Sequence, residues 1–162
     1  MIFITIPTLL SYSGGMQVPD LLPWGYGPEY IRTLFWKLDD QGRDYYLFRQ
    51  IPLDLLFPAL FAWTNTLLLV FLLSKVGGKA LGFIPTAIIP ISAGIFDYSE
   101  NIALILLLLI FPAIPDNLVS WASIFTVLKS IFTTVFFILL FTVLMLLFLK
   151  WIRGTGSRSA SL

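Results

Sequence analysis

Long apolar stretches, separated by short polar segments, dominate this chain. Three of them, residues 45–74, 83–111 and 119–152, are long enough to cross a bilayer, because a hydrocarbon core of about 30 Å requires a helix of roughly 20 apolar residues. Pro112 and Pro115 end the second stretch, since proline lacks the amide donor that continues a helix. The pattern predicts an all-α fold, an integral membrane helical bundle with three spanning helices.

The apolar segment at residues 1–19 allows two interpretations. It begins with the strongly apolar run MIFITIPTLL, which the segment from Ser11 to Gly15 interrupts before a full span is reached. One interpretation is a signal-like or partly inserted segment, although it has no basic start and no small-residue cleavage site. We favour the other interpretation, in which the segment is the end of a fourth, N-terminal spanning helix.

Residues 20–44 are the most polar part of the chain, and they predict a short amphipathic helix. Pro28 suits the first helical position and Gly42 suits a C-terminal stop. Apolar side chains recur between them at helical spacing, and basic or acidic side chains occupy the other side. The apolar positions are Tyr30, Ile31, Leu34, Phe35 and Leu38, and the polar ones are Arg32, Lys37 and Asp39. We expect this helix to lie in the membrane interface, where Trp and Tyr are enriched, and the alternative is an ordinary connector.

The composition excludes several classes of function. Hydrophobic residues make up 58% of the 162 residues and charged residues 12%, whereas soluble domains carry about 25% charged residues. We therefore predict a single membrane domain, with a disordered polar tail at residues 153–162. The net charge of +1 gives no basis for nucleic-acid binding. Because the sequence has no Cys and no His, we expect no disulfide, no metal site and no cofactor.

The charges of the loops predict an orientation. Lys75 and Lys79 lie in one short loop, and Lys150, Arg153 and Arg158 lie at the end of the last apolar stretch and in the tail, on the same face of the bundle. Basic loops stay in the cytoplasm, so we expect the C-terminus to be cytoplasmic, at the plasma membrane if the protein is bacterial. The loop with the single charge of Asp116 then lies outside.

Each predicted spanning helix carries a stripe of polar residues along one face, at helical spacing. Because polar side chains facing lipid are costly, we expect the three stripes to converge inside the bundle as one polar cluster. The candidate members are Asp54 and Asn65 on the first helix, Asp97, Glu100 and Asn101 on the second, and Lys129 on the third. Flanking candidates are Arg43, Tyr46, Tyr98, Thr126 and Thr133.

Lys129 can pair with Glu100 or Asp97, which leaves at least one acid without a base. One interpretation is a site, open to the outer face, for a proton, a small solute or a lipid headgroup. The alternative is structural, with polar bonds that fix helix register in an accessory subunit of a larger membrane complex. Besides the lipid bilayer, the expected partners are then another membrane protein or a second copy of the chain.

A third interpretation is an intramembrane enzyme that modifies lipids with carboxylates as acid and base. Without His, only a Ser–Lys pair such as Ser130 or Ser123 with Lys129 remains as a nucleophile. Gly94-Ile-Phe-Asp97 lacks the second Gly of the intramembrane aspartyl protease motif. The sequence therefore favours a non-enzymatic role and assigns no catalytic residue.

The order of GYGPEY, GRDYYLFRQIPLDLLFP, FDYSEN and TVLK resembles a group of small, uncharacterised multipass membrane proteins, mostly bacterial. The resemblance covers about Gly25 to Lys129. It implies a four-helix membrane fold and brings no activity with it. In that group a complete spanning helix precedes the Gly-Tyr segment, whereas here only a short apolar run does. We therefore expect the start of this sequence to be truncated or misassigned.

Overall fold

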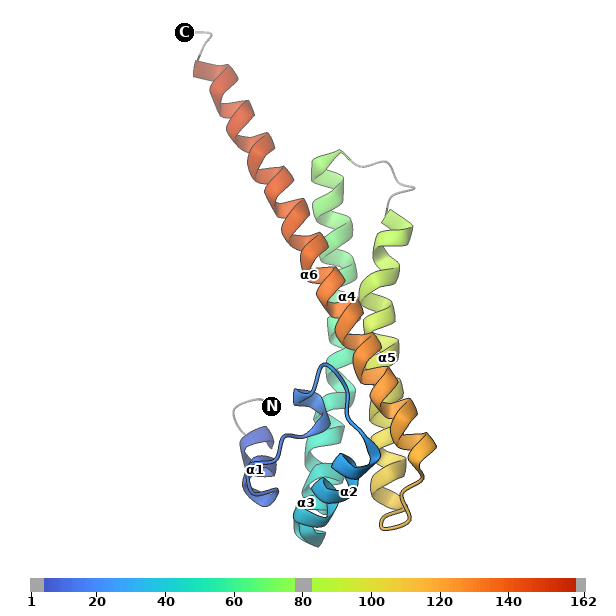
Figure 1. Cartoon of the computed structure of the whole chain (residues 1–162). Coiled ribbons are helices and arrows are strands. Elements are labelled where there is room, and N and C mark those ends of the chain that lie inside the picture. Colours follow the sequence, from blue (N-terminus) through green and yellow to red (C-terminus); the bar gives the residue numbers. More distant parts are fainter. Residues whose placement is uncertain (1–4, 78–82, 160–162) are drawn as a thin grey trace.

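The computed structural model describes residues 5–77 and 83–159. It is 86% helical, with no strand among the described residues, so the predicted all-α fold is confirmed. Three helices are long and apolar enough to cross a membrane (Figure 1). The elements are α1 (Thr5–Tyr12), the 3₁₀ helix η1 (Pro19–Leu21), α2 (Pro28–Lys37), α3 (Asp39–Tyr45), the π-helical η2 (Tyr46–Gln50), α4 (Ile51–Val76), α5 (Phe83–Leu109) and α6 (Asp116–Ser159).

The three long helices form the bundle, and α5 is its central member. α5 packs against both α4 and α6, which contact each other much less. At Gly94 the backbones of α4 and α5 approach closely, because a Cβ atom there would lie 3.1 Å from the Pro58 carbonyl oxygen. Beyond this region α6 diverges from the other two helices, and its C-terminal end stands apart from them (Figure 1).

The segment from α1 to α3 gathers at the other end of the bundle (Figure 1). The apolar face predicted for residues 28–38 is present, since Ile31, Leu34, Phe35 and Leu38 are fully buried. These side chains belong to the same core as Leu104 and its neighbours on α5 and α6. The apolar face of α2 therefore packs against protein, and the position of this helix in the membrane interface stays a prediction.

The predicted end of this amphipathic helix at Gly42 is wrong. α2 ends at Lys37 and the chain bends at Asp39, which has a φ of 52°. Gly42, the predicted stop, lies inside α3, where a Cβ atom would come within 3.0 Å of Tyr12. The close packing of α1 on α3 thus favours glycine at this position, which does not end a helix.

The predicted N-terminal span is not among the described helices that are long enough to cross a membrane. α1 has eight residues, which corresponds to about 12 Å of helix. At the other end, α6 continues to Ser159, past residue 153, where the disordered tail was predicted to begin. Each further residue adds a backbone hydrogen bond to a helix that is already formed. Lys79 and residues 160–162 lie outside the described residues.

Candidate functional site

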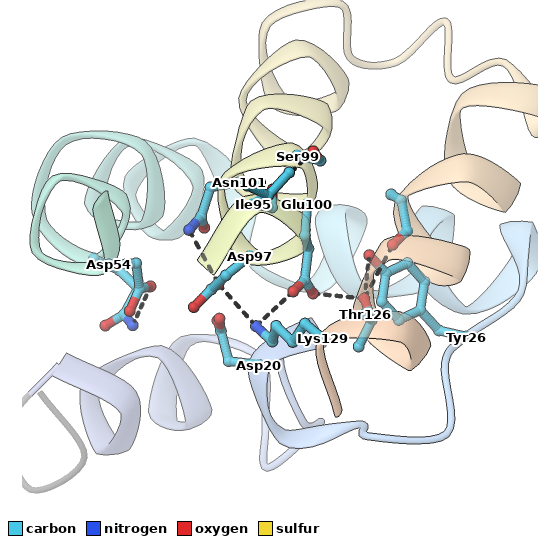
Figure 2. A network of polar contacts seen from close by, with 12 residues as sticks. Asp20, Tyr26, Asp54, Ile95, Asp97, Ser99, Glu100, Asn101, Thr126 and Lys129 are labelled. Atoms are coloured by element: carbon cyan, nitrogen blue, oxygen red, sulfur yellow. Dashed lines mark hydrogen bonds and ion pairs between the residues drawn. The ribbon is translucent and has the colours of Figure 1, made fainter. Parts of the chain in front are cut away.

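A buried ion-pair network joins the middle of α5 to α6 (Figure 2). The Lys129 ammonium lies 2.5 Å from Glu100 Oε2 and 3.1 Å from Asp97 Oδ1. Glu100 is fully buried, and Asp97 and Lys129 expose less than a fifth of their side chains. Lys129 thus makes both of the ion pairs that the sequence offered as alternatives. The two acids stand three residues apart, nearly one helical turn, so one ammonium from the neighbouring helix reaches both.

The second carboxylate oxygen of Glu100 accepts a hydrogen bond from α6, at a residue that also contacts the segment before α2. Thr126 donates its hydroxyl to Glu100 Oε1 at 2.6 Å, and the Tyr26 hydroxyl lies 3.4 Å from Thr126. Burial, and to a smaller extent the charge of Glu100, raises the pKa of Tyr26 above its usual value of 10.0. Tyr26 is therefore a neutral phenol at physiological pH, and it closes the network on this side.

The position of Tyr26 depends on Gly25. Gly25 has a φ of +86°, and a Cβ atom there would collide with the Ser123 hydroxyl. The backbone N–H of Tyr26 donates to the same hydroxyl at 2.9 Å. Only glycine allows the chain to lie this close to α6 in this conformation.

Two more carboxyl groups, from Asp54 on α4 and Asp20 on η1, lie at the edge of this network (Figure 2). Gln50 donates to Asp54 at 2.6 Å, and the Tyr46 hydroxyl donates to Asp20 at 3.2 Å. Among the described residues, no Lys or Arg lies within ion-pair distance of either carboxyl. The region therefore holds four carboxyl groups and the single ammonium of Lys129.

Some of these polar groups line a cavity of about 520 Å³. α5 forms its back wall, α4 and α6 form its sides, and α1 and η1 border one end. The charged lining residues are Asp20, Asp54, Asp97 and Lys129, and the other polar ones are Ser130, Thr133 and Thr134. Phe57 on α4 and Phe137 on α6 also line it and are more than half exposed. The cavity thus combines a few charged and hydroxyl groups with a mostly apolar lining, and Phe57 and Phe137 mark its exposed side, on α4 and α6.

Most of the residues predicted for the polar cluster meet in this region, and three, Tyr98, Asn65 and Arg43, do not. Asn101 lies 3.4 Å from Asp97, and Thr133 lines the cavity. Tyr98 donates to the Leu55 carbonyl oxygen, which ties α5 to α4. Asn65 instead donates to the Phe61 carbonyl of its own helix.

Arg43 lies outside the cluster. It pairs with Asp40, donates to the Phe35 carbonyl oxygen at 2.6 Å and stacks on the Phe111 ring. These contacts join α3 to α2 and to the end of α5. Its role in the structure is therefore to hold the helices together at that end of the bundle.

The sequence analysis missed Asp20, Tyr26 and Gln50. Asp20 and Tyr26 lie in the segment assigned to the interface, and no helical spacing relates them to α4, α5 or α6. Gln50 precedes Asp54 by one helical turn, and this spacing was a usable signal. Its Oε1 atom is buried and has no hydrogen-bond partner among the described residues.

The described residues hold no group of three or more Asp, Glu, His or Cys side chains arranged to bind a metal ion. No protein-family model, no curated protein and no solved structure matches the chain. The function is therefore argued from the geometry of the cavity.

Proposed function

We propose that this chain is a multi-pass membrane protein that binds a polar or amphipathic ligand in the cavity between α4 and α6. The observation that carries the proposal is the combination of a few charged groups and a mostly apolar lining in one cavity of about 520 Å³. Pockets for small molecules commonly have volumes of about 300–1,000 Å³, with a few polar groups in an apolar lining.

The walls of the cavity are held in place before a ligand arrives. Lys129 is fixed by two acids of α5, and Asp54 is fixed by Gln50. Ordered polar groups bind a ligand more tightly, because less conformational freedom is lost on binding. Interhelical bonds that only fix register would not require a hollow beside them.

In this proposal the basic end of the bundle, with Lys75 and Lys150, faces the cytoplasm. The ammonium of Lys150 donates to the Lys75 carbonyl oxygen at 3.0 Å, so the two residues stand at one level. The cavity and the segment from α1 to α3 then lie toward the outer face.

The proposal is tested by filling the cavity. Thr133→Trp places an indole in the hollow, whereas Leu144→Trp places it on an exposed part of α6 that does not line the cavity. We expect native mass spectrometry from mild detergent to show a retained ligand on the wild type and on Leu144→Trp, and at least about tenfold less on Thr133→Trp. Equal retention by all three proteins would contradict the proposal.

A second candidate is a structural role as an accessory subunit. It is favoured by the hydroxyl-bearing residues Ser130, Thr133 and Thr134 along α6, because small and hydroxyl side chains are common where transmembrane helices meet. In that case a spanning helix of another protein covers the exposed side of the cavity. Co-purification of one partner in fixed stoichiometry, lost in Thr133→Trp, would support this role over ligand binding.

A further inference from the structure

Two apolar hollows along α6 adjoin the cavity. One has about 250 Å³ and shares Pro23, Ser130 and Thr134 with the cavity. The other shares Thr134 and Phe137 with it and extends along α6 to Thr142. Both apolar hollows thus adjoin the cavity at Thr134, an arrangement suited to a ligand with a polar head and two apolar chains.

Two carboxyl groups of the cavity, those of Asp20 and Asp54, form no ion pair among the described residues. Asp97 and Glu100 share the Lys129 ammonium, whereas Asp20 and Asp54 have only neutral donors, Tyr46 and Gln50. A primary ammonium carries three N–H donors, and its charge would match these two carboxyl groups. The hydroxyls of Ser130 and Thr133, which line the same cavity, can donate to an anionic oxygen next to that ammonium.

The expected depth of the cavity in the membrane agrees with the position of a lipid headgroup. Lys75 follows Asp54 by 21 residues along α4, and Lys150 follows Lys129 by 21 residues along α6, with no charged residue in either interval. At 1.5 Å per residue each interval measures about 31 Å, close to the thickness of about 30 Å of a hydrocarbon core. With the lysines at one boundary of the core, the acids of the cavity lie at the other boundary, beside the headgroups of one leaflet.

From these observations we infer that the ligand is a two-chain membrane lipid with a primary ammonium in its headgroup. The ammonium lies between Asp20 and Asp54, and the acyl chains leave through the exposed side of the cavity and follow the two hollows along α6. The inference rests on the proposed function, and it adds the chemical class of the ligand and the route by which it enters from the bilayer.

The experiment compares lipids that differ in the headgroup alone. The full chain is reconstituted in vesicles with equal parts of phosphatidylethanolamine, phosphatidylcholine and phosphatidylglycerol with identical chains, then extracted in mild detergent for native mass spectrometry. We expect phosphatidylethanolamine to be enriched at least about tenfold on the protein, because the methylated ammonium of phosphatidylcholine has no N–H donor.

The variants locate the site. Asp20→Asn combined with Asp54→Asn should return the bound lipids to the ratio in the vesicles, and Asp44→Asn, an exposed residue of α3, should leave the enrichment unchanged. If the double variant does not fold, Asp20→Asn alone is used, since η1 lies outside the spanning helices. Lipids bound in the vesicle ratio by the wild type, or enrichment that survives the loss of both acids, would overturn the inference.

The two proposals fail in different ways. If the wild type retains a ligand of another class and Thr133→Trp does not, the inference of a lipid with a primary ammonium is wrong, but the proposal that the cavity binds a ligand is supported. If the wild type and Thr133→Trp retain equal amounts of ligand, both the proposed binding function and the inference about the ligand class are wrong.

Discussion

The two halves of α6 are similarly apolar but have different surroundings. In the half near α2, the side chains of Val119, Ala122 and Thr126 are buried against the rest of the protein. In the half that follows Lys129, only Phe136 and Val143 are buried among the residues up to 152. The first half is part of a protein core, whereas the second half presents its apolar side chains to the surroundings, which in a membrane are lipid.

The same contrast separates α5 from its neighbours. In the most apolar stretch of α5, 44% of the residues are buried, against 11% in the corresponding stretches of α4 and α6. α5 is covered on both sides, so its apolar residues near Leu104 serve packing between helices. An apolar stretch in this chain therefore belongs either to the protein core or to a lipid-facing surface. The polar cluster lies between the core near α2 and the lipid-facing part of the bundle.

The largest expected effect on stability comes from removing the positive charge of Lys129 from the polar cluster. Lys129→Met leaves the buried Glu100 and its neighbour Asp97 without a cation, and we expect the free energy of unfolding to fall by about 3–5 kcal/mol. Unfolding in mixed micelles with increasing dodecyl sulfate measures this. The triple variant with Asp97→Asn and Glu100→Gln should recover most of the loss, because no unpaired charge then remains.

A matched pair of leucines tests the contrast between core and lipid-facing surface. Leu104 on α5 is fully buried and Leu146 on α6 is 47% exposed. Leu104→Ala should lower the free energy of unfolding by about 3 kcal/mol, since it leaves a void in a packed core. Leu146→Ala should change it by about 0.5 kcal/mol or less, because lipid chains fill the space. Equal losses in the same micelle assay would show that both leucines have the same surroundings.

The smallest expected effect is a pH dependence that comes from Tyr26. Because the folded state raises its pKa above the unfolded value of 10.0, the folded protein holds this proton longer. The free energy of unfolding should therefore be independent of Tyr26 below about pH 9 and should fall above pH 10, by at most about 1.4 kcal/mol per pH unit. Thermal unfolding in detergent between pH 7 and 11 measures the slope, which Tyr26→Phe should reduce.

Helical spacing in the sequence was sufficient to predict the pairing across α5 and α6. Asp97, Glu100 and Lys129 each stand on a polar stripe of an apolar helix, and burying such stripes against each other is less costly than exposing them to lipid. The same reasoning wrongly placed Asn65 in the polar cluster. Its side-chain amide donates to the Phe61 carbonyl oxygen, one turn away on its own helix. A local partner of this kind removes the need for a partner on another helix.

The sequence by itself determined that the chain is helical, that three stretches can span a membrane and which charges must be sheltered, because these properties follow from local composition and period. Only the tertiary structure decided that the apolar face of α2 covers α5, since hydropathy cannot distinguish a protein core from lipid. It also brought Asp20 and Tyr26 to the cluster, because contacts between residues far apart in the chain leave no periodic trace in the sequence.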